Sequence, residues 1–163
     1  MLSTSTHGDS AVAGGIRRPP FLYLACLVLG LALDRLLPLP LTYPEPTSIG
    51  WTAGGALIAI GVAIMLAGAR NFSRAATPVP SNQPVRALVT TGIHGWSRNP
   101  IYVGMCLVYA GIGIAARSPW ILILALPLFI ILRYGVIARE ETYLERRFGD
   151  AYRDYKARVR RWL

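Results

Sequence analysis

Four long apolar segments constrain the fold of this chain more than any other feature of its sequence. They run over residues 21–37, 49–69, 101–116 and 119–138. An α-helix needs about 20 apolar residues to cross the roughly 30 Å of hydrocarbon in a bilayer, and the second segment meets that length without a single charge. The third segment is short and borrows a turn from its flanks. We therefore expect an all-α protein, a polytopic membrane helix bundle with about four transmembrane helices.

The composition excludes an ordinary soluble domain. Hydrophobic residues make up 53% of the chain and charged residues only 15%, whereas about a quarter of the residues of a soluble domain are charged. The two cysteines, Cys26 and Cys106, both lie within apolar segments and have no partner at metal-binding spacing. We therefore expect neither a disulfide framework nor a metal site.

The distribution of the basic residues indicates a membrane topology. The formal net charge is +9, and the arginines and lysines gather in three places: the N-terminal tail, the stretch between the second and third apolar segments, and the stretch after the fourth. The two other loops carry few basic residues. By the positive-inside rule, both termini and the middle loop are expected to be cytoplasmic. The charge then reflects topology and contact with anionic membrane lipids, and we expect no nucleic-acid partner.

The remaining segments suggest one domain with a tail. Residues 1–20 are rich in Ser, Thr, Gly and Ala and are predicted to be disordered, and residues 21–163 form a single membrane domain. Within it, residues 70–100 and 139–163 form the expected cytoplasmic region. Residues 70–100 are too apolar for a free linker, and their prolines prevent one continuous helix. Such a long irregular loop with apolar and aromatic residues favours a functional role.

The last segment, 139–163, is predicted to be helical with one interruption. The fourth membrane helix is expected to continue into the cytoplasm and to stop at Phe148 and Gly149. Asp150 can cap the helix that follows, because a short acceptor side chain bonds the free backbone donors of a first turn. Tyr152 and Tyr155 recur on one face of this second helix. It is therefore amphipathic and is expected to rest at the membrane interface.

Two groups of polar residues lie at the ends of the apolar segments. The first occupies residues 88–104, where a glycine-containing turn leads to Pro100, a residue suited to the first turn of a helix. Free backbone N–H groups at such a turn can hold an anionic ligand group. The second is the pair Glu140 and Glu141, which follows the fourth segment. Ionisable residues near membrane depth are functional candidates, because burying them is costly.

Each of these residues also has a structural interpretation. Arg98 and Arg139 can serve only to set the topology of the helices. His94 is better explained as a hydrogen-bonding loop residue than as a metal ligand, because no second ligand accompanies it. Glu141 is expected to pair with Arg139, with Arg146 or with water.

Four motifs in the second half of the chain carry a family resemblance. They are Leu-Val-Thr-Thr-Gly at 88–92, Arg-Asn-Pro-Ile-Tyr-Val-Gly at 98–104, Glu-Glu at 140–141 and Phe-Gly-Asp-Ala-Tyr-Arg-Asp-Tyr at 148–155. Their order, their spacing and the helical hairpin between them agree with one family. The chain resembles the isoprenylcysteine carboxyl methyltransferases and their wider relatives, which include phospholipid N-methyltransferases.

The resemblance implies an S-adenosylmethionine-dependent methyltransferase. Members of the family bind this cofactor in a pocket that faces the cytoplasm, and they admit lipophilic acceptors from the bilayer. The cofactor contacts that the resemblance implies are Arg86, Ala87, Leu88, Val89, His94, Asn99, Pro100, Ile101, Tyr102 and Glu140. The catalytic residues that it implies are Glu140, Arg133 and Arg139.

Three positions depart from the family pattern. Family members often have histidine where this chain has Asn99, and an aromatic residue where it has His94. The prenylcysteine enzymes also carry an arginine, which serves the substrate carboxylate, one turn before the glutamate. This chain has Val136 there, and Arg133 and Arg139 are the nearest substitutes. The departures leave the acceptor open, as a lipophilic or small molecule.

Two other interpretations remain open at the level of sequence. Membrane sterol reductases share a similar Arg-x-Pro-x-Tyr and Glu pattern but bind NADPH, and their chains are usually longer. A small membrane scaffold without enzymatic activity would also carry such spans. The short chain suggests a bacterial inner membrane as the location, and the sequence leaves the oligomeric state open.

Overall fold

The computed structural model describes residues 19–39, 46–79 and 84–163, and every regular element in these ranges is a helix. The elements are α1 (Pro19–Leu36), α2 (Thr47–Arg74), the 3₁₀-helix η1 (Gly92–Gly95), α3 (Pro100–Ala115), α4 (Pro119–Ile131), the π-helix η2 (Leu132–Ile137), α5 (Ala138–Phe148) and α6 (Asp150–Arg158). The all-α prediction is confirmed. The predicted disordered tail, residues 1–20, lies almost entirely outside the described residues.

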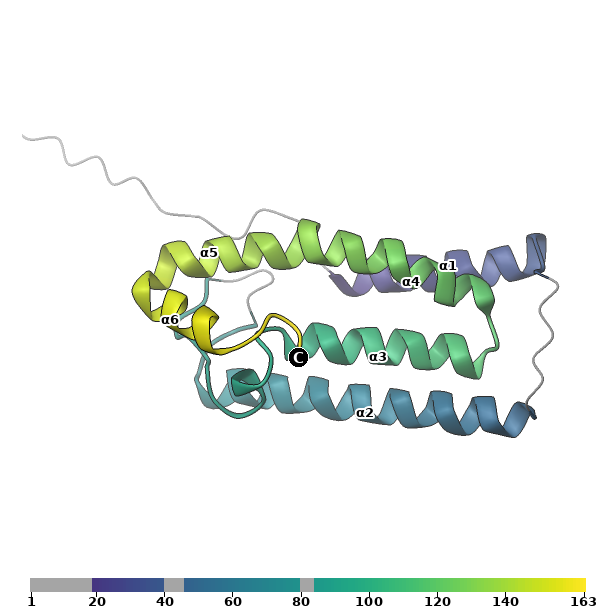
Figure 1. Cartoon of the computed structure of the whole chain (residues 1–163), viewed down its shortest axis with the longest axis horizontal. Coiled ribbons are helices and arrows are strands. Elements are labelled where there is room, and N and C mark those ends of the chain that lie inside the picture. Colours follow the sequence, from purple (N-terminus) through teal and green to yellow (C-terminus); the bar gives the residue numbers. More distant parts are fainter. Residues whose placement is uncertain (1–18, 40–45, 80–83) are drawn as a thin grey trace, which may run out of the picture.

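The long helices run side by side along the molecule (Figure 1). Helices α4, η2 and α5 form one continuous rod, Pro119–Phe148. This rod, α1 and α2 are each long and apolar enough to cross a membrane, whereas α3 is shorter. The prediction of about four apolar helices, with a short third one, is confirmed in the number, length and apolar character of the helices. Only helices satisfy their backbone hydrogen bonds within one segment, which is why apolar stretches of this length fold as helices in lipid.

Helices α2 and α3 are held together by glycines that let their backbones touch. Gly61 of α2 and Gly104 of α3 face each other, and a Cβ added to Gly61 would lie 2.6 Å from the Gly104 carbonyl oxygen. A Cβ added to Gly104 would lie 2.5 Å from the Gly61 carbonyl oxygen. Gly54 and Gly111 repeat this arrangement one heptad away. Only glycine fits such a contact, which is a common means of association for helices in lipid.

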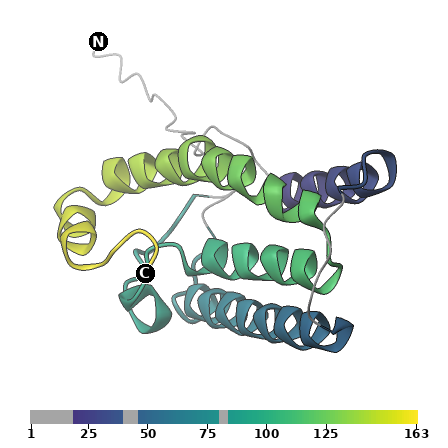
Figure 2. The same cartoon turned by 45° about the vertical axis from the view of Figure 1, so that its right-hand side comes forward.

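The other half of the bundle is α1 packed against α4, as both views show (Figures 1 and 2). Ile121 and Leu128 of α4 and Leu132 of η2 are fully buried between the helices. Tyr23 of α1 contacts Tyr109 of α3 edge to face, with 6.0 Å between the ring centroids. These contacts join α1 and α4 to the α2–α3 pair and bring the cytoplasmic segments expected from the sequence to one end of the bundle.

The C-terminal helices end as predicted but pack differently. Helix α5 ends at Phe148, and Gly149 makes the turn into α6 with a φ of 56°, which confirms the predicted stop. The predicted cap by Asp150 is wrong, since Gly149 takes the N-cap position and Asp150 is the first residue of α6, where its carboxylate accepts from the Arg153 guanidinium. The two tyrosines of α6 are buried within the protein. The loop before α3 covers this face, since the Tyr155 hydroxyl donates to the His94 carbonyl oxygen at 2.7 Å, and the position of the helix at the membrane interface stays a prediction.

Candidate functional site

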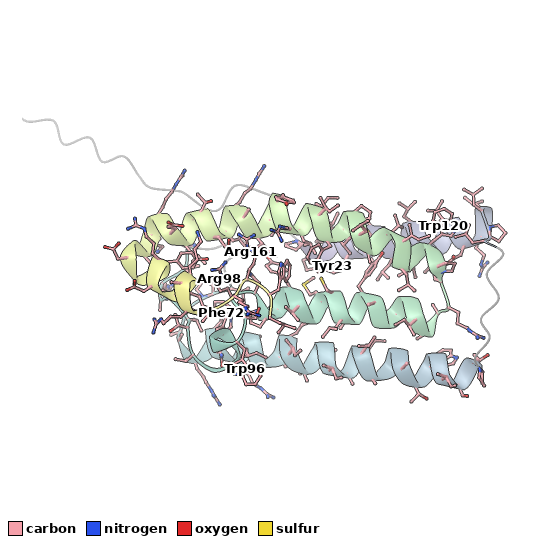
Figure 3. The ribbon with its side chains drawn as sticks, in the orientation of Figure 1. Tyr23, Phe72, Trp96, Arg98, Trp120 and Arg161 are labelled. Carbon is pink, nitrogen blue, oxygen red and sulfur yellow. The ribbon has the colours of Figure 1, made fainter. Side chains whose placement is uncertain are left out.

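Two adjoining cavities lie at the end of the bundle where α2 ends, α3 begins and α5 and α6 fold over. The larger has a volume of about 150 Å³ and the smaller about 40 Å³. Five residues line both cavities: Phe72, His94, Arg98, Asn99 and Glu140. The labelled residues Phe72, Arg98 and Arg161 gather at this end, whereas Trp120 lies at the opposite end (Figure 3). Polar and aromatic groups are thus concentrated in one place, next to apolar helices.

Glu140 and Tyr102 form the central polar pair of the larger cavity. The Tyr102 hydroxyl donates to Glu140 Oε1 at 2.8 Å, and both side chains are buried. Tyr102 lies in the first turn of α3, which begins at Pro100, and Glu140 lies in the first turn of α5. Because a buried carboxylate must be hydrogen-bonded, the tyrosine holds Glu140 in one position. A fixed carboxylate beside a cavity can receive the ammonium or hydroxyl groups of a ligand.

Glu141 takes part in a different, buried ion network. Its Oε1 accepts from Arg98 at 2.9 Å, and its Oε2 accepts from Arg161 at 2.6 Å. Arg161 Nε also donates to Oε1 at 3.1 Å. The sequence predicted an ion pair or water for Glu141, but it named Arg139 and Arg146 as the partners. The actual partners are distant in sequence, so the spacing of charges along α5 could not reveal them.

This network fastens residues 159–163 to the turn before α3. The Arg98 backbone N–H donates to the Arg160 carbonyl oxygen at 3.0 Å, and Asn99 Nδ2 donates to the Arg161 carbonyl oxygen at 3.1 Å. Ser97 Oγ donates to the same carbonyl at 3.3 Å. Asn99 therefore lines the cavities while its Nδ2 is bonded to residue 161 of the C-terminal segment. This bond helps to hold the turn before Pro100 and Tyr102.

His94 is a buried, neutral hydrogen-bonding residue. Its Nδ1 lies 3.3 Å from Asn71 Nδ2, and its ring packs edge to face on Phe72 at 4.9 Å. Its carbonyl oxygen accepts from the Tyr155 hydroxyl at 2.7 Å. Burial lowers the pKa of the imidazole from 6.5 to about 4, because the charged form loses its hydration. Among the described residues, no three His, Cys, Asp or Glu side chains come together as a metal site would require.

The structure brings together most of the residues that the sequence singled out. Pro100, Ile101 and Tyr102 line the larger cavity; Ala87, Leu88 and Val89 line the smaller one; His94, Asn99 and Glu140 line both. Arg86, Arg133 and Arg139 line neither cavity. The Arg86 backbone N–H is instead bonded to Thr77 Oγ1 at 2.8 Å, which ties residues 84–91 to the end of α2.

Sequence reasoning missed several residues of the walls. Phe72 lies in the last turns of α2, beyond the apolar segment that predicted this helix, and it lines both cavities. Met105 lies one turn after Tyr102 and reads in the sequence as an ordinary apolar position. Arg98 also lines both cavities, and its Nε is buried without a partner among the described residues. Only the folded structure reveals such an unpaired buried donor.

Comparison with known proteins bears on this site. The profile of the phospholipid methyltransferase family matches residues 49–151, which include all but the first two residues of α2 and the whole of α3, α4 and α5. The chain is 33% identical to the protein-S-isoprenylcysteine O-methyltransferase of Rattus norvegicus over 125 residues, which are 72% of this chain and 43% of that protein. It is 62% identical to an uncharacterized protein of Haemophilus influenzae over 34 residues, which are 21% of this chain and 54% of that protein.

The chain thus spans about half the length of these curated relatives. No solved structure matches it. The profile match covers well over half of the chain, including the turn before α3 and the two glutamates of α5. The resemblance that the motifs suggested is therefore confirmed, and the chain belongs to the phospholipid methyltransferase family.

Proposed function

We propose that this chain is an integral membrane methyltransferase that uses S-adenosylmethionine to methylate a lipophilic or small acceptor. The observation that carries the proposal is the buried Glu140–Tyr102 pair at the wall of a cavity that Arg98 also lines. Membership of the family supports the reaction class. The cavity end is proposed to face the cytoplasm of a bacterial inner membrane, in keeping with the basic residues of the chain.

The chemistry of the walls fits the methyl donor. Its amino-acid portion carries an ammonium group, which suits the Glu140 carboxylate, and a carboxylate, which suits the Arg98 guanidinium. Its adenine is flat and largely apolar, and Phe72, Ile101 and Leu88 offer apolar surface nearby. The charged and apolar side chains of the cavity walls are therefore consistent with a zwitterionic ligand that has an aromatic portion. It is less suited to the several phosphates of NADPH, because two of the three charged side chains that line the two cavities, Glu140 and Glu141, are carboxylates.

We propose that binding widens the site. Pockets for cofactor-sized ligands usually measure about 300–1,000 Å³, and the larger cavity here measures about 150 Å³. The two cavities share five wall residues, so a shift of these side chains would join them. We propose that the cofactor binds across both cavities, in contact with Ala87, Leu88 and Val89 on one side and with Pro100, Ile101 and Tyr102 on the other. Arg86 is proposed to contact it from residues 84–91.

The protein is proposed to align the methyl donor with the acceptor and to exclude water from the site. When bound, the methyl donor would supply an electrophilic carbon on a sulfonium, to which the acceptor's lone pair would form a bond as the carbon–sulfur electron pair passed to sulfur. The reaction requires the three atoms to lie in line, and holding them so contributes several kcal/mol. Glu140 and Tyr102 are proposed to fix the donor. Arg133 and Arg139 are the candidates for holding an acceptor group.

Equilibrium binding tests the proposal. S-Adenosylmethionine and, separately, NADPH are titrated into the detergent-purified chain, and heat is measured. We expect saturable binding of the first only. Glu140→Gln removes one charge-assisted hydrogen bond and should weaken binding by about 10- to 100-fold. Glu145→Gln is the matched control, since Glu145 lies on the same helix in solvent.

Each result has a definite meaning. A Glu140→Gln variant that binds as tightly as the wild type would refute the site. Binding of NADPH alone would favour a reductase. Binding of neither ligand by folded protein would favour a non-enzymatic scaffold and would leave the family match as shared ancestry.

A further inference from the structure

Asn71, in the last turn of α2, makes two hydrogen bonds with one nitrogen atom. Its Nδ2 donates to the Thr91 carbonyl oxygen at 2.7 Å and lies 3.3 Å from His94 Nδ1. Asn71 itself lines neither of the two cavities, whereas His94 lines both and is only 3% exposed. The pair therefore connects the end of α2 with the wall of the proposed cofactor site.

The Thr91 carbonyl group decides which end of the Asn71 amide faces His94. A carbonyl oxygen only accepts, so the amide atom that lies 2.7 Å from it must be the NH₂ group. The same carbonyl oxygen accepts the His94 backbone N–H at 3.2 Å, which brings the imidazole next to the amide. Gly92 leaves room for the amide, since a Cβ added there would lie 2.5 Å from Asn71 Nδ2. The orientation of the amide thus follows from its hydrogen bonds.

This orientation determines where the imidazole carries its proton. An amide NH₂ group donates and cannot accept, so His94 Nδ1 must be the acceptor across the 3.3 Å contact. Burial lowers the pKa of His94 to about 4, so the ring holds a single proton at neutral pH. Because Nδ1 accepts, that proton lies on Nε2.

Nε2 is the nitrogen of the His94 ring that remains for a ligand. Among the described residues, the ring makes its one hydrogen bond to Asn71. Phe72, which also lines both cavities, packs edge to face on the ring at 4.9 Å. These two contacts fix the plane of the ring and so the direction of the Nε2–H bond. A fixed neutral donor suits an oxygen or an aromatic nitrogen of a ligand.

We propose that Asn71 is a positioning residue that holds His94 in the tautomer with its proton on Nε2, and that this N–H donates to an acceptor atom of the ligand in the cavities. The identity of the ligand as S-adenosylmethionine rests on the function proposed above, but the tautomer does not. That methyl donor offers acceptor atoms in its carboxylate, its ribose hydroxyls and its adenine ring. Position 94 is also one where this chain departs from the family pattern, so the motifs assign no such donor.

NMR of the full chain in detergent micelles, labelled with ¹⁵N-histidine, tests the tautomer without any ligand. The chain has two histidines, so a His7→Gln variant leaves the signals of His94 alone. The couplings of the carbon-bound ring hydrogens to the two nitrogens show which nitrogen is protonated. We expect the proton on Nε2 in this chain and on Nδ1 in Asn71→Asp, because a carboxylate accepts where the amide donated.

The conditions and the control keep this comparison specific. The spectra are recorded at about pH 8.5, where the ring stays neutral even if the new carboxylate raises its pKa by about 1–3 from about 4. Ser73→Ala is the matched control, since Ser73 is exposed on the same helix and its Oγ donates to the Ala69 carbonyl oxygen. It should leave the proton on Nε2.

Calorimetric titration of S-adenosylmethionine at the same pH tests the bond to the ligand. His94→Phe keeps a ring against Phe72 but removes the donor, and it should weaken binding by about 2- to 10-fold. Asn71→Asp should weaken binding to a similar extent. In the double variant, Asn71→Asp should add no further loss, because Asn71 acts through His94. A general structural effect of Asn71, or a direct effect of the new charge, would instead add in full.

The outcomes separate this proposal from the proposed function. A proton on Nδ1 in the chain with Asn71 intact would overturn the proposal, and that result needs no variant of the site to fold. Additive losses in the double variant would overturn it as well, while loss of binding in Glu140→Gln would leave the function intact. Absence of S-adenosylmethionine binding by the folded chain would refute the function and the ligand bond of His94, and NMR would still decide the tautomer.

Discussion

Replacement of Glu141 by glutamine removes the charge on which two arginines converge. The Arg98 and Glu141 side chains are only 8% and 7% exposed, and Arg161 is 28% exposed. Breaking a buried ion pair by neutralising one partner costs about 3–5 kcal/mol, because the other charge stays buried without compensation. Glutamine keeps the size of the side chain and one acceptor oxygen, and Arg161 can reach water. We therefore expect a loss of about 3 kcal/mol of unfolding free energy.

The loss can be measured by unfolding in mixed micelles, with an increasing fraction of a denaturing detergent followed by circular dichroism. Glu145→Gln is the control, because Glu145 pairs with Lys156 and Arg153 in solvent and should show no measurable change. Hydrogen exchange adds a local readout. The Arg98 N–H, which is bonded to the Arg160 carbonyl, should exchange faster in Glu141→Gln, since residues 159–163 lose their anchor.

A Glu141→Gln variant as stable as Glu145→Gln would refute this reasoning. It would mean that the hydrogen bonds of residues 97–99 to the carbonyl oxygens of residues 160 and 161 hold residues 159–163 in place by themselves. Unchanged stability with faster exchange at Arg98 would assign the network a local role only.

Three further predictions concern other parts of the molecule. Gly61→Ala should destabilise the fold by about 1–3 kcal/mol, because the added methyl group would lie 2.6 Å from a backbone oxygen of α3. Gly55→Ala is the control and should not destabilise the fold, because nothing lies within 4 Å of the added methyl group. The same unfolding assay compares the two variants. Because the pKa of His94 is about 4 in the folded chain and about 6.5 when unfolded, the unfolded chain binds the proton first as the pH falls. Stability should therefore decline between pH 6.5 and 4, by at most about 1.4 kcal/mol per pH unit, and His94→Asn should remove that part of the decline. Tyr102→Phe removes the 2.8 Å bond that positions Glu140 and should weaken binding of S-adenosylmethionine by about 10-fold in calorimetric titration, with little change in folding.

The glutamate pair of α5 illustrates where prediction from sequence succeeds and where it fails. Both residues were recognised as candidates because ionisable groups beside an apolar span are costly. Glu140 and Glu141 are adjacent, so they point in different directions around the helix, and only the packing of α3, α5 and residues 159–163 decides what each one meets. Glu140 meets Tyr102, and Glu141 meets Arg98 and Arg161.

Helix α6 illustrates the same limit. The spacing of Tyr152 and Tyr155 correctly predicted an apolar face, but periodicity carries no information about what covers that face. Both membrane lipid and the protein's own loop would satisfy the pattern. The structure places the Tyr155 hydroxyl on the His94 carbonyl, because residues 92–95 return to α6 after the end of α2.

The sequence by itself determined the helices, their approximate ends and the family motifs. These features depend on local properties: the length of apolar runs, the turn chemistry of Pro100 and Gly149, and the order of short motifs. The tertiary structure alone decided the glycine contact of α2 with α3, the π-helical turn before Glu140 and the contact of Trp162 with Phe129 of α4. Those features bring together residues that are far apart in the chain, and their energies depend on distances that no local pattern specifies.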